Sequence, residues 1–434
     1  MKTFLHPLQN LAEMEAIYTK AKSNRGILEI SGCMESQKAH LIYGLSGLFT
    51  SHLILAEDEK AAKELYEDYR FYDKNVYYYP AKDLLFFQAD IHGNLLIRQR
   101  MRVIKALLEQ KENITVVTSI DGCMDYLQPF DKIEKQLIHF RNDSTLDMDK
   151  LKDALVHMGY ERVGQVEMPG QFSVRGGIVD IYSLTEENPW RIELWGDEID
   201  SIRTFDSQSQ RSLENLDEIM IYPATEQPAE KGGVSFLDYF AEKNSLVFLD
   251  EPNRLEENAR AVEEEFRQSC ENRQQKGEEN ISQNWMCRWE DLNHKLNNRN
   301  CISVSLMEPK RADWKITEQF NLTVKSMSSY QSSFELLVKD LRQYKKQGYQ
   351  IVLLSGSRTR AERLAKDLQD EGLSAFYGQD FDRVLEPGEI MVAYGHARKG
   401  FEYPFIKFAI ITETDIFGKE QKKRKKKKEY NGCL

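Results

Sequence analysis

Residues 26–39 read GILEISGCMESQKA and place a short apolar strand, a loop and the start of a helix in succession. Helical patterns follow at 57–71 and 95–110. Further apolar runs stand before, between and after them, at 52–56 (HLILA), 76–79 (VYYY) and 114–118 (ITVVT). Strands that alternate with helices of this length are typical of βαβ units, which build a parallel sheet. The sequence therefore predicts an α/β fold.

Residues 32–39 have the spacing of the phosphate-binding loop GxxxxGK[ST]. Gln37 stands where that loop has its second glycine, and Ala39 stands where it has the hydroxyl that ligates Mg²⁺. Glu35 adds a negative charge where a triphosphate would lie. Lys38 alone cannot replace these contacts. Two interpretations stay open, a degenerate nucleotide loop and a plain turn between a strand and a helix.

A pair of acidic residues later in the chain supports the interpretation of a degenerate nucleotide loop. The apolar run 246–250 (LVFLD) ends in Asp250 and is followed by Glu251, as in nucleotidases whose strand-end acids hold Mg²⁺ and position water. Acidic pairs at strand ends are also common without such a role. We therefore expect Gly32, Lys38, Asp250 and Glu251 to be vestigial nucleotide-site positions, and we expect no catalytic residue. None of the eight histidines pairs with a cysteine or another histidine at ligand spacing, so we expect no metal site.

The charge of the chain is unevenly distributed. The 434 residues include 59 Lys and Arg against 70 Asp and Glu, a net charge of −11. A run of seven basic residues, KKRKKKK, occupies 422–428; without it and Glu429, the rest has 52 basic and 69 acidic residues, or −17. An acidic body argues against a protein that coats DNA. The basic run itself is consistent with a helical linker, a phosphate-backbone contact or a nuclear signal.

The ends and the cysteines indicate a cellular compartment. The first ten residues have no apolar core of signal-peptide length, and no apolar run is long enough to span a membrane. The six cysteines are scattered without a CxxC pair, which excludes the common zinc spacings and a secreted disulfide scaffold. We expect a reduced, cytoplasmic location and no membrane contact.

A small β-rich unit interrupts the α/β pattern after residue 159. Its most specific stretch, 171–182 (QFSVRGGIVDIY), is interpreted as one strand, followed by strands at 190–195 and 199–205. Alternation along one strand places Phe172, Val174, Gly176 and Ile178 on one face, and Ser173, Arg175, Gly177 and Val179 on the other. Arg175 between small residues has the composition of an interface anchor, although a solvated surface arginine would look the same.

These patterns predict a multidomain chain. A parallel-sheet domain with the degenerate loop occupies 1–150, and an inserted antiparallel β domain occupies 151–228. A mostly helical remainder of the first domain follows at 229–325. A second α/β domain comprises 326–418, and a basic helical linker comprises 419–434.

Several of these stretches together resemble the bacterial transcription-repair coupling factors (Mfd). The resemblance covers essentially the whole chain. It rests on the broken loop and on 77–87 (YYYPAKDLLFF), 114–127 (ITVVTSIDGCMDYL), 171–182, 190–212 (WRIELWGDEIDSIRTFDSQSQRS) and 408–418 (FAIITETDIFG).

The resemblance implies a module similar to UvrB, with domains like 1a, 2 and 1b of that protein, that has lost its ATP-site residues. It implies that the β domain binds UvrA, the damage sensor of excision repair, through positions matching Phe172, Arg175, Gly176, Ile178 and Asp180. The family often has an arginine near 161, whereas this chain has Glu161 followed by Arg162.

In the family, ATP and Mg²⁺ serve a DNA translocase in later domains, and RNA polymerase and double-stranded DNA also bind later domains. This chain is then expected to be a monomeric, non-catalytic fragment without a cofactor of its own. Two alternatives remain: a UvrB-like ATP-dependent enzyme that opens damaged DNA, and a weak DNA-binding protein that acts through the basic run.

Overall fold

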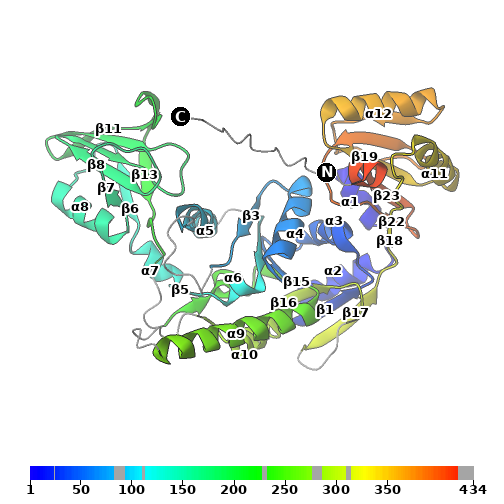
Figure 1. Ribbon diagram of the computed structural model, residues 1–434, viewed down its shortest axis with the longest axis horizontal. Coiled ribbons are helices and arrows are strands. Elements are labelled where there is room, and N and C mark those ends of the chain that lie inside the picture. Colours follow the sequence, from blue (N-terminus) through cyan, green and yellow to red (C-terminus); the bar gives the residue numbers. More distant parts are fainter. Residues whose placement is uncertain are drawn as a thin grey trace, which may run out of the picture.

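Three units lie in a row in the computed structural model of the chain (Figure 1). The structure describes residues 1–23, 25–82, 93–109, 113–226, 232–275, 286–308 and 314–418. We call residues 138–221 the β domain and residues 325–417 the C-terminal unit. The remaining described residues form the central unit, which lies between the other two.

The central unit is built on a sheet of seven parallel strands in the order β17-β1-β16-β15-β2-β4-β3. Most of these strands are continuous apolar runs buried on both faces, as expected for a parallel sheet covered by helices. In chain order they are β1 (Gly26–Ser31), β2 (Ser51–Ala56), β3 (Val76–Tyr79), β4 (Ile114–Ser119), β15 (Ser245–Asp250), β16 (Asn300–Val304) and β17 (Ile316–Asn321).

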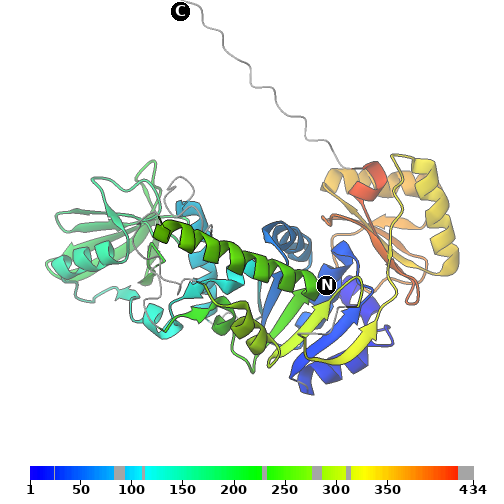
Figure 2. The same ribbon diagram turned by 60° about the horizontal axis from the view of Figure 1, so that its bottom comes forward.

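Helices cover both faces of this sheet. One layer, which packs against residues such as Leu28 and Ile54, consists of α1 (Lys2–Leu8), α2 (Met14–Ser23), α3 (Glu35–Ser46) and α4 (Glu59–Tyr72). The opposite layer, which packs against residues such as Ile27 and Leu53, includes α5 (Gly93–Leu108), α6 (Ile120–Met124), α9 (Pro252–Gln275) and α10 (Trp289–Leu296). The long helix α9 extends from the central sheet toward the β domain (Figure 2).

The β domain contains a six-stranded sheet in the order β12-β11-β10-β9-β8-β7. Its strands are β7 (Glu161–Arg162), β8 (Gln171–Arg175), β9 (Ile178–Ile181), β10 (Trp190–Trp195), β11 (Glu198–Phe205) and β12 (Ser212–Leu216), with helix α8 (Met148–His157) beside them. The chain enters through β6 (Ile138–Arg141) and leaves through β13 (Glu218–Ile221). These two strands pair antiparallel, so the domain is attached by a two-stranded ribbon.

Short elements join the ribbon to the central unit: β5 (Tyr126–Leu127), α7 (Phe130–Glu134), β14 (Val234–Ser235) and the 3₁₀ helix Phe236–Tyr239. A buried ion network lies at this junction. Arg100 donates from Nε to Glu226 Oε1 at 2.5 Å and from Nη1 to the carbonyl oxygen of Pro80 at 2.7 Å. Asp125 Oδ2 lies 2.7 Å from Nη1. The network therefore joins α5 to the segment that leaves the β domain.

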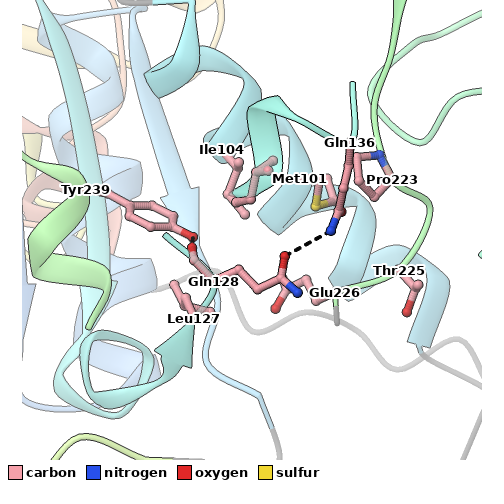
Figure 3. A pocket seen from close by; sticks show the side chains of 10 residues that line it. Met101, Ile104, Leu127, Gln128, Gln136, Pro223, Thr225, Glu226 and Tyr239 are labelled. Atoms are coloured by element: carbon pink, nitrogen blue, oxygen red, sulfur yellow. Dashed lines mark hydrogen bonds between the residues drawn. The ribbon is translucent and has the colours of Figure 1, made fainter. Parts of the chain in front are cut away.

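A small cavity of about 30 Å³ lies beside this network (Figure 3). The hydroxyl of Tyr239 donates to the carbonyl oxygen of Gln128, and the amide of Gln136 donates to Gln128 Oε1. A cavity of this volume accommodates one or two water molecules but no larger ligand.

The C-terminal unit has its own sheet, in the order β18-β22-β23-β19-β21-β20. Its parallel strands are β19 (Gln350–Ser355), β20 (Ala375–Tyr377), β21 (Ile390–Tyr394) and β23 (Phe408–Thr412); its antiparallel strands are β18 (Lys325–Ser326) and β22 (Phe401–Tyr403). Helices α11 (Phe334–Gln347) and α12 (Arg358–Asp370) cover one face, and α13 (Glu413–Phe417) follows β23. The other face, including Val352 and Met391, shares a hydrophobic core with α1, α3 and α4.

The predicted α/β class, with a parallel sheet and a smaller antiparallel sheet, is confirmed. Two local predictions are wrong. The stretch 171–182 is a hairpin of β8 and β9 and not one strand. The described residues of 229–325 are not mostly helical, because besides α9 and α10 they supply β15, β16 and β17 to the central sheet. The predicted linker, 419–434, lies outside the described residues.

Candidate functional site

The β8–β9 hairpin forms the first candidate site. Gly176 and Gly177 make its two-residue turn, and Gly176 has a φ of 59°, a left-handed conformation that favours glycine. Arg175 pairs with Ile178 across the turn. Directly paired residues share a face of an antiparallel sheet, so Ile178 lies on the face of Arg175. The single-strand interpretation had placed Ile178 with Phe172, and the turn reverses that assignment.

Asp180 is the centre of this face. Its side chain is 1% exposed and accepts three hydrogen bonds from two arginines. Arg191 donates from Nε to Oδ1 at 2.7 Å and from Nη2 to Oδ2 at 2.9 Å, and Arg175 donates from Nη2 to Oδ2 at 3.1 Å. Two guanidinium groups are therefore oriented by one buried carboxylate.

The two arginines differ in what remains available to a partner. Arg191 stacks over the ring of Phe205 at 4.4 Å from its centroid and also donates to Gln210. Its contacts with Asp180 raise its pKa further above the ordinary value. Arg175 makes only one of the three bonds to Asp180, and its side chain is 51% exposed. It is therefore a pre-oriented cation that presents hydrogen-bond donors to solvent.

Trp195 extends this face, and the sequence interpretation did not include it as a site residue. It is 83% exposed, at the end of β10. Its neighbour Leu194 donates its backbone N–H to the carbonyl oxygen of Gly177 at 2.8 Å, which places Trp195 beside the hairpin turn. The alternation in WRIELW, which orients Arg191, Glu193 and Trp195 to one face, is the sequence signal that could have found it.

The residues expected to bind UvrA do not all reach the surface. Phe172 is fully buried in the hydrophobic core, so it supports the sheet and cannot touch a partner directly. Asp180 acts through the arginines that it holds. Arg175, Gly176 and Ile178 remain at least partly accessible. Glu161 and Arg162 are exposed on the edge strand β7.

The second candidate site is the loop between β1 and α3. Because all seven strands are parallel, the carboxyl ends of β1 and β15 lie at the same edge of the sheet, where Lys38 meets the two acids. Its ammonium donates to Asp250 Oδ1 at 2.6 Å and to Glu251 Oε1 at 2.6 Å. The lysine side chain is 9% exposed. It neutralises two carboxylates of its own chain.

The backbone donors of this loop also have partners within the chain. Gly32 donates to the carbonyl oxygen of Leu306 and Cys33 to that of Ser305. The amide N–H of Met34 is bound by Gln37 Oε1 at 3.0 Å. In a phosphate-binding loop such N–H groups surround the phosphate. Here protein oxygens occupy these donors.

Gln37 connects the loop to the C-terminal unit. Its amide nitrogen donates to the hydroxyl of Tyr403 at 2.8 Å, and that hydroxyl also lies 3.2 Å from His40 Nδ1. Burial lowers the pKa of His40 to about 4, so its ring is neutral in this core. The residue that replaces the second loop glycine is thus a contact between units.

A glycine is required at position 32 for a different physical reason than in a phosphate loop. A Cβ at this position would lie 2.0 Å from the carbonyl oxygen of Leu322, and its φ is 78°. The glycine therefore permits the chain after β17 to approach β1 closely. The position of Gly32 in the motif spacing is therefore explained by this close approach, and no bound phosphate is needed to explain it.

Burial and charge oppose each other in this cluster. Burial raises the pKa of Asp250 above its ordinary value, although the nearby Lys38 ammonium counteracts the shift. Burial would lower the pKa of Lys38, but Asp250 and Glu251 outweigh it and raise that pKa. Removing the lysine would leave two neighbouring carboxylates with no cation between them.

In the part of the chain that the structure describes, no three His, Cys, Asp or Glu side chains group to hold a metal ion. The five cysteines in these ranges are free thiols. None of the helices there is both long and apolar enough to cross a bilayer.

Comparison with known proteins agrees with the first site. Residues 138–226 match the family described as the UvrB interaction domain, and they include the whole β domain. The chain is 28% identical to the transcription-repair-coupling factor of Bacillus subtilis (strain 168), over 93% of this chain and 40% of that protein. Over most of its length, the chain is similar to transcription-repair-coupling factors.

Further relatives carry the same name. A transcription-repair-coupling factor of Staphylococcus haemolyticus is 26% identical over 81% of this chain and 34% of its own length. One of Staphylococcus aureus (strain MRSA252) is 25% identical over 82% of this chain and 35% of its own length. The resemblance predicted from the motifs is confirmed. The chain spans about a third to two fifths of the length of these curated relatives.

Proposed function

We propose that this chain is a non-catalytic docking module that binds UvrA through the outer face of the β domain. The observation that carries the proposal is the pre-oriented, half-exposed Arg175 beside the exposed Trp195. Arginine and tryptophan are the residue types most enriched at energetic centres of protein interfaces. The match to the UvrB interaction domain over these residues supports the same partner.

The test is surface plasmon resonance with the full chain and UvrA from the same organism. Arg175→Ala is expected to weaken binding at least tenfold, because an interfacial charge partner would be left unpaired, and Trp195→Ala is expected to do the same. Arg141→Ala is the matched control, since Arg141 is an exposed arginine on the ribbon that pairs with Glu218. Undiminished UvrA binding by both site variants would refute the proposed surface.

We also propose that the chain binds no nucleotide at the β1–α3 loop and needs no cofactor there. The contacts of Lys38 with Asp250 and Glu251 support this. Isothermal titration calorimetry with Mg-ATP tests it, and micromolar binding that Lys38→Met abolishes would show an active loop. A cytoplasmic location, a monomeric state and contacts of the relatives' further domains with RNA polymerase and duplex DNA belong to the same proposal.

A further inference from the structure

A large groove lies between the central unit and the C-terminal unit, and none of its lining residues belongs to either site described above. Its volume is about 690 Å³. Helix α4 and the segment after it form one wall, and the carboxyl ends of β19, β20 and β21 form the other, where Gly356, Gly378 and Gly395 line the groove. Open α/β sheets bind ligands at the carboxyl ends of their parallel strands. The volume is that of a small-molecule site.

Positive charge collects along this groove. Arg70 and Lys74 line the groove on the α4 side, and Arg358 lines it at the start of α12. Within the described ranges, none of these three cations forms an ion pair with a carboxylate, and Glu67 is the one acidic residue in the lining. This is unexpected in a chain with a net charge of −11.

Other arginines near this junction show the ordinary arrangement. Arg398 pairs with Asp68 and Glu64, and Arg383 and Arg360 also have carboxylate partners. Acidic residues are therefore available at the junction, yet among the described residues the three cations of the groove form no ion pair with any of them. A lining that carries three cations without ion-pair partners against one carboxylate, Glu67, fits an anionic ligand.

An aromatic surface accompanies the charge. Tyr394, at the end of β21, is 52% exposed, and the Arg358 guanidinium lies 6.0 Å from its ring centroid. The two walls are held together below it, because Phe71 of α4 packs on Gly395. A Cβ there would lie 2.3 Å from the Phe71 ring. The groove thus has a fixed floor, and Tyr394 offers a face on which a planar group can stack.

We propose that this groove binds a nucleotide, with its phosphate held by Arg358, Arg70 and Lys74 and its base stacked on Tyr394. The ligand is either a free nucleotide or one unit of a single-stranded nucleic acid, which share this chemistry. The site is separate from the β1–α3 loop and does not depend on UvrA binding.

Fluorescence anisotropy of the full chain with a labelled ten-nucleotide thymidine strand tests the proposal, with AMP and ATP as unlabelled competitors. Arg358→Ala and Lys74→Ala are each expected to weaken binding about five- to tenfold through the loss of a charged contact. Arg363→Ala, on the same helix but outside the groove, is the matched control and is expected to change binding less than about twofold. Tyr394→Ala is expected to weaken binding, whereas Tyr394→Phe retains the stacking face and is expected to bind normally.

The two ligand sources give different results. Competition by AMP or ATP at concentrations close to the affinity of the strand indicates a free nucleotide. Weak competition together with a negative logarithmic salt slope, about −0.7 for each phosphate that the groove neutralises, indicates a strand. The proposal is overturned if neither probe binds at millimolar concentration, or if binding is unchanged in Arg358→Ala and Lys74→Ala, as expected when the basic run 422–428 alone is responsible.

Discussion

Replacing Lys38 by methionine separates a structural role of the β1–α3 loop from a catalytic one. The substitution keeps most of the side-chain volume and removes the charge between Asp250 and Glu251. Breaking a buried ion pair by removing one partner costs about 3–5 kcal/mol. Glu251 is 24% exposed and still accepts the N–H of Leu306, so we expect the lower end, about 3 kcal/mol. This corresponds to a fall in melting temperature of about 6–12 °C.

The pH dependence of this loss has a defined sign. Burial already raises the pKa of Asp250, and loss of the Lys38 ammonium raises it further. A carboxyl whose folded-state pKa lies above its unfolded value destabilises the fold while it is ionised, and protonation relieves that cost. The stability difference between Lys38→Met and the unaltered chain should therefore decrease as the pH falls from 8 to 5.

Differential scanning calorimetry over this pH range measures both effects. Lys20→Met is the matched control, because Lys20 forms an ion pair with Glu318 on the surface, where such a pair contributes less than about 1 kcal/mol. The double variant Lys38→Met with Asp250→Asn should recover part of the loss. Equal, small shifts for Lys38→Met and Lys20→Met would refute the view that this lysine is a buried structural counter-ion.

Three further predictions concern the β domain and its junction. Asp180→Asn should destabilise the chain by about 2–3 kcal/mol in urea, because the mostly buried Arg191 loses its counter-ion, whereas Arg175→Ala should cost less than about 1 kcal/mol; the reverse ranking would contradict the geometry. Gly176→Ala should cost about 1 kcal/mol in the same assay through the φ of 59°, and an unchanged midpoint would show that the turn adapts. Although burial would raise the pKa of Glu226, Arg100 and Lys82 lower it to about 2 from 4.5. The stability advantage over Glu226→Gln should then be largest above pH 4.5 and narrow toward pH 2, and a pH-independent difference in chemical denaturation would disprove it.

Local patterns in the sequence predicted the central α/β frame well. Strands such as β1, β2 and β4 are continuous apolar runs, and their pairing in a covered parallel sheet follows from burial on both faces. The hairpin at 171–182 was missed because alternation continues across two glycines, and only the positive φ of Gly176 reveals the reversal. That single turn changes the face of every later residue in the stretch.

The partners in the two candidate sites depended on long-range packing. The sequence showed that Gln37 replaces the second glycine of the loop motif. It could not show the contact of Gln37 with Tyr403, because the two residues are 366 positions apart. Likewise, the sequence identified Asp180 without showing that it holds Arg191 as well as Arg175. The sequence therefore predicted the chemical character of individual residues. It did not predict the geometry of a site whose partners come from distant elements.

The ribbon that attaches the β domain has a consequence for protein engineering. The register of β6 and β13 pairs Ile138 with Ile221, so the two points at which the chain enters and leaves the domain are neighbours in space. A tight turn could join them with little loop-closure entropy. We therefore expect that the β domain can be exchanged for that of a relative at these two points, provided that its contacts with α5, such as that of Lys105 with Glu186, are kept.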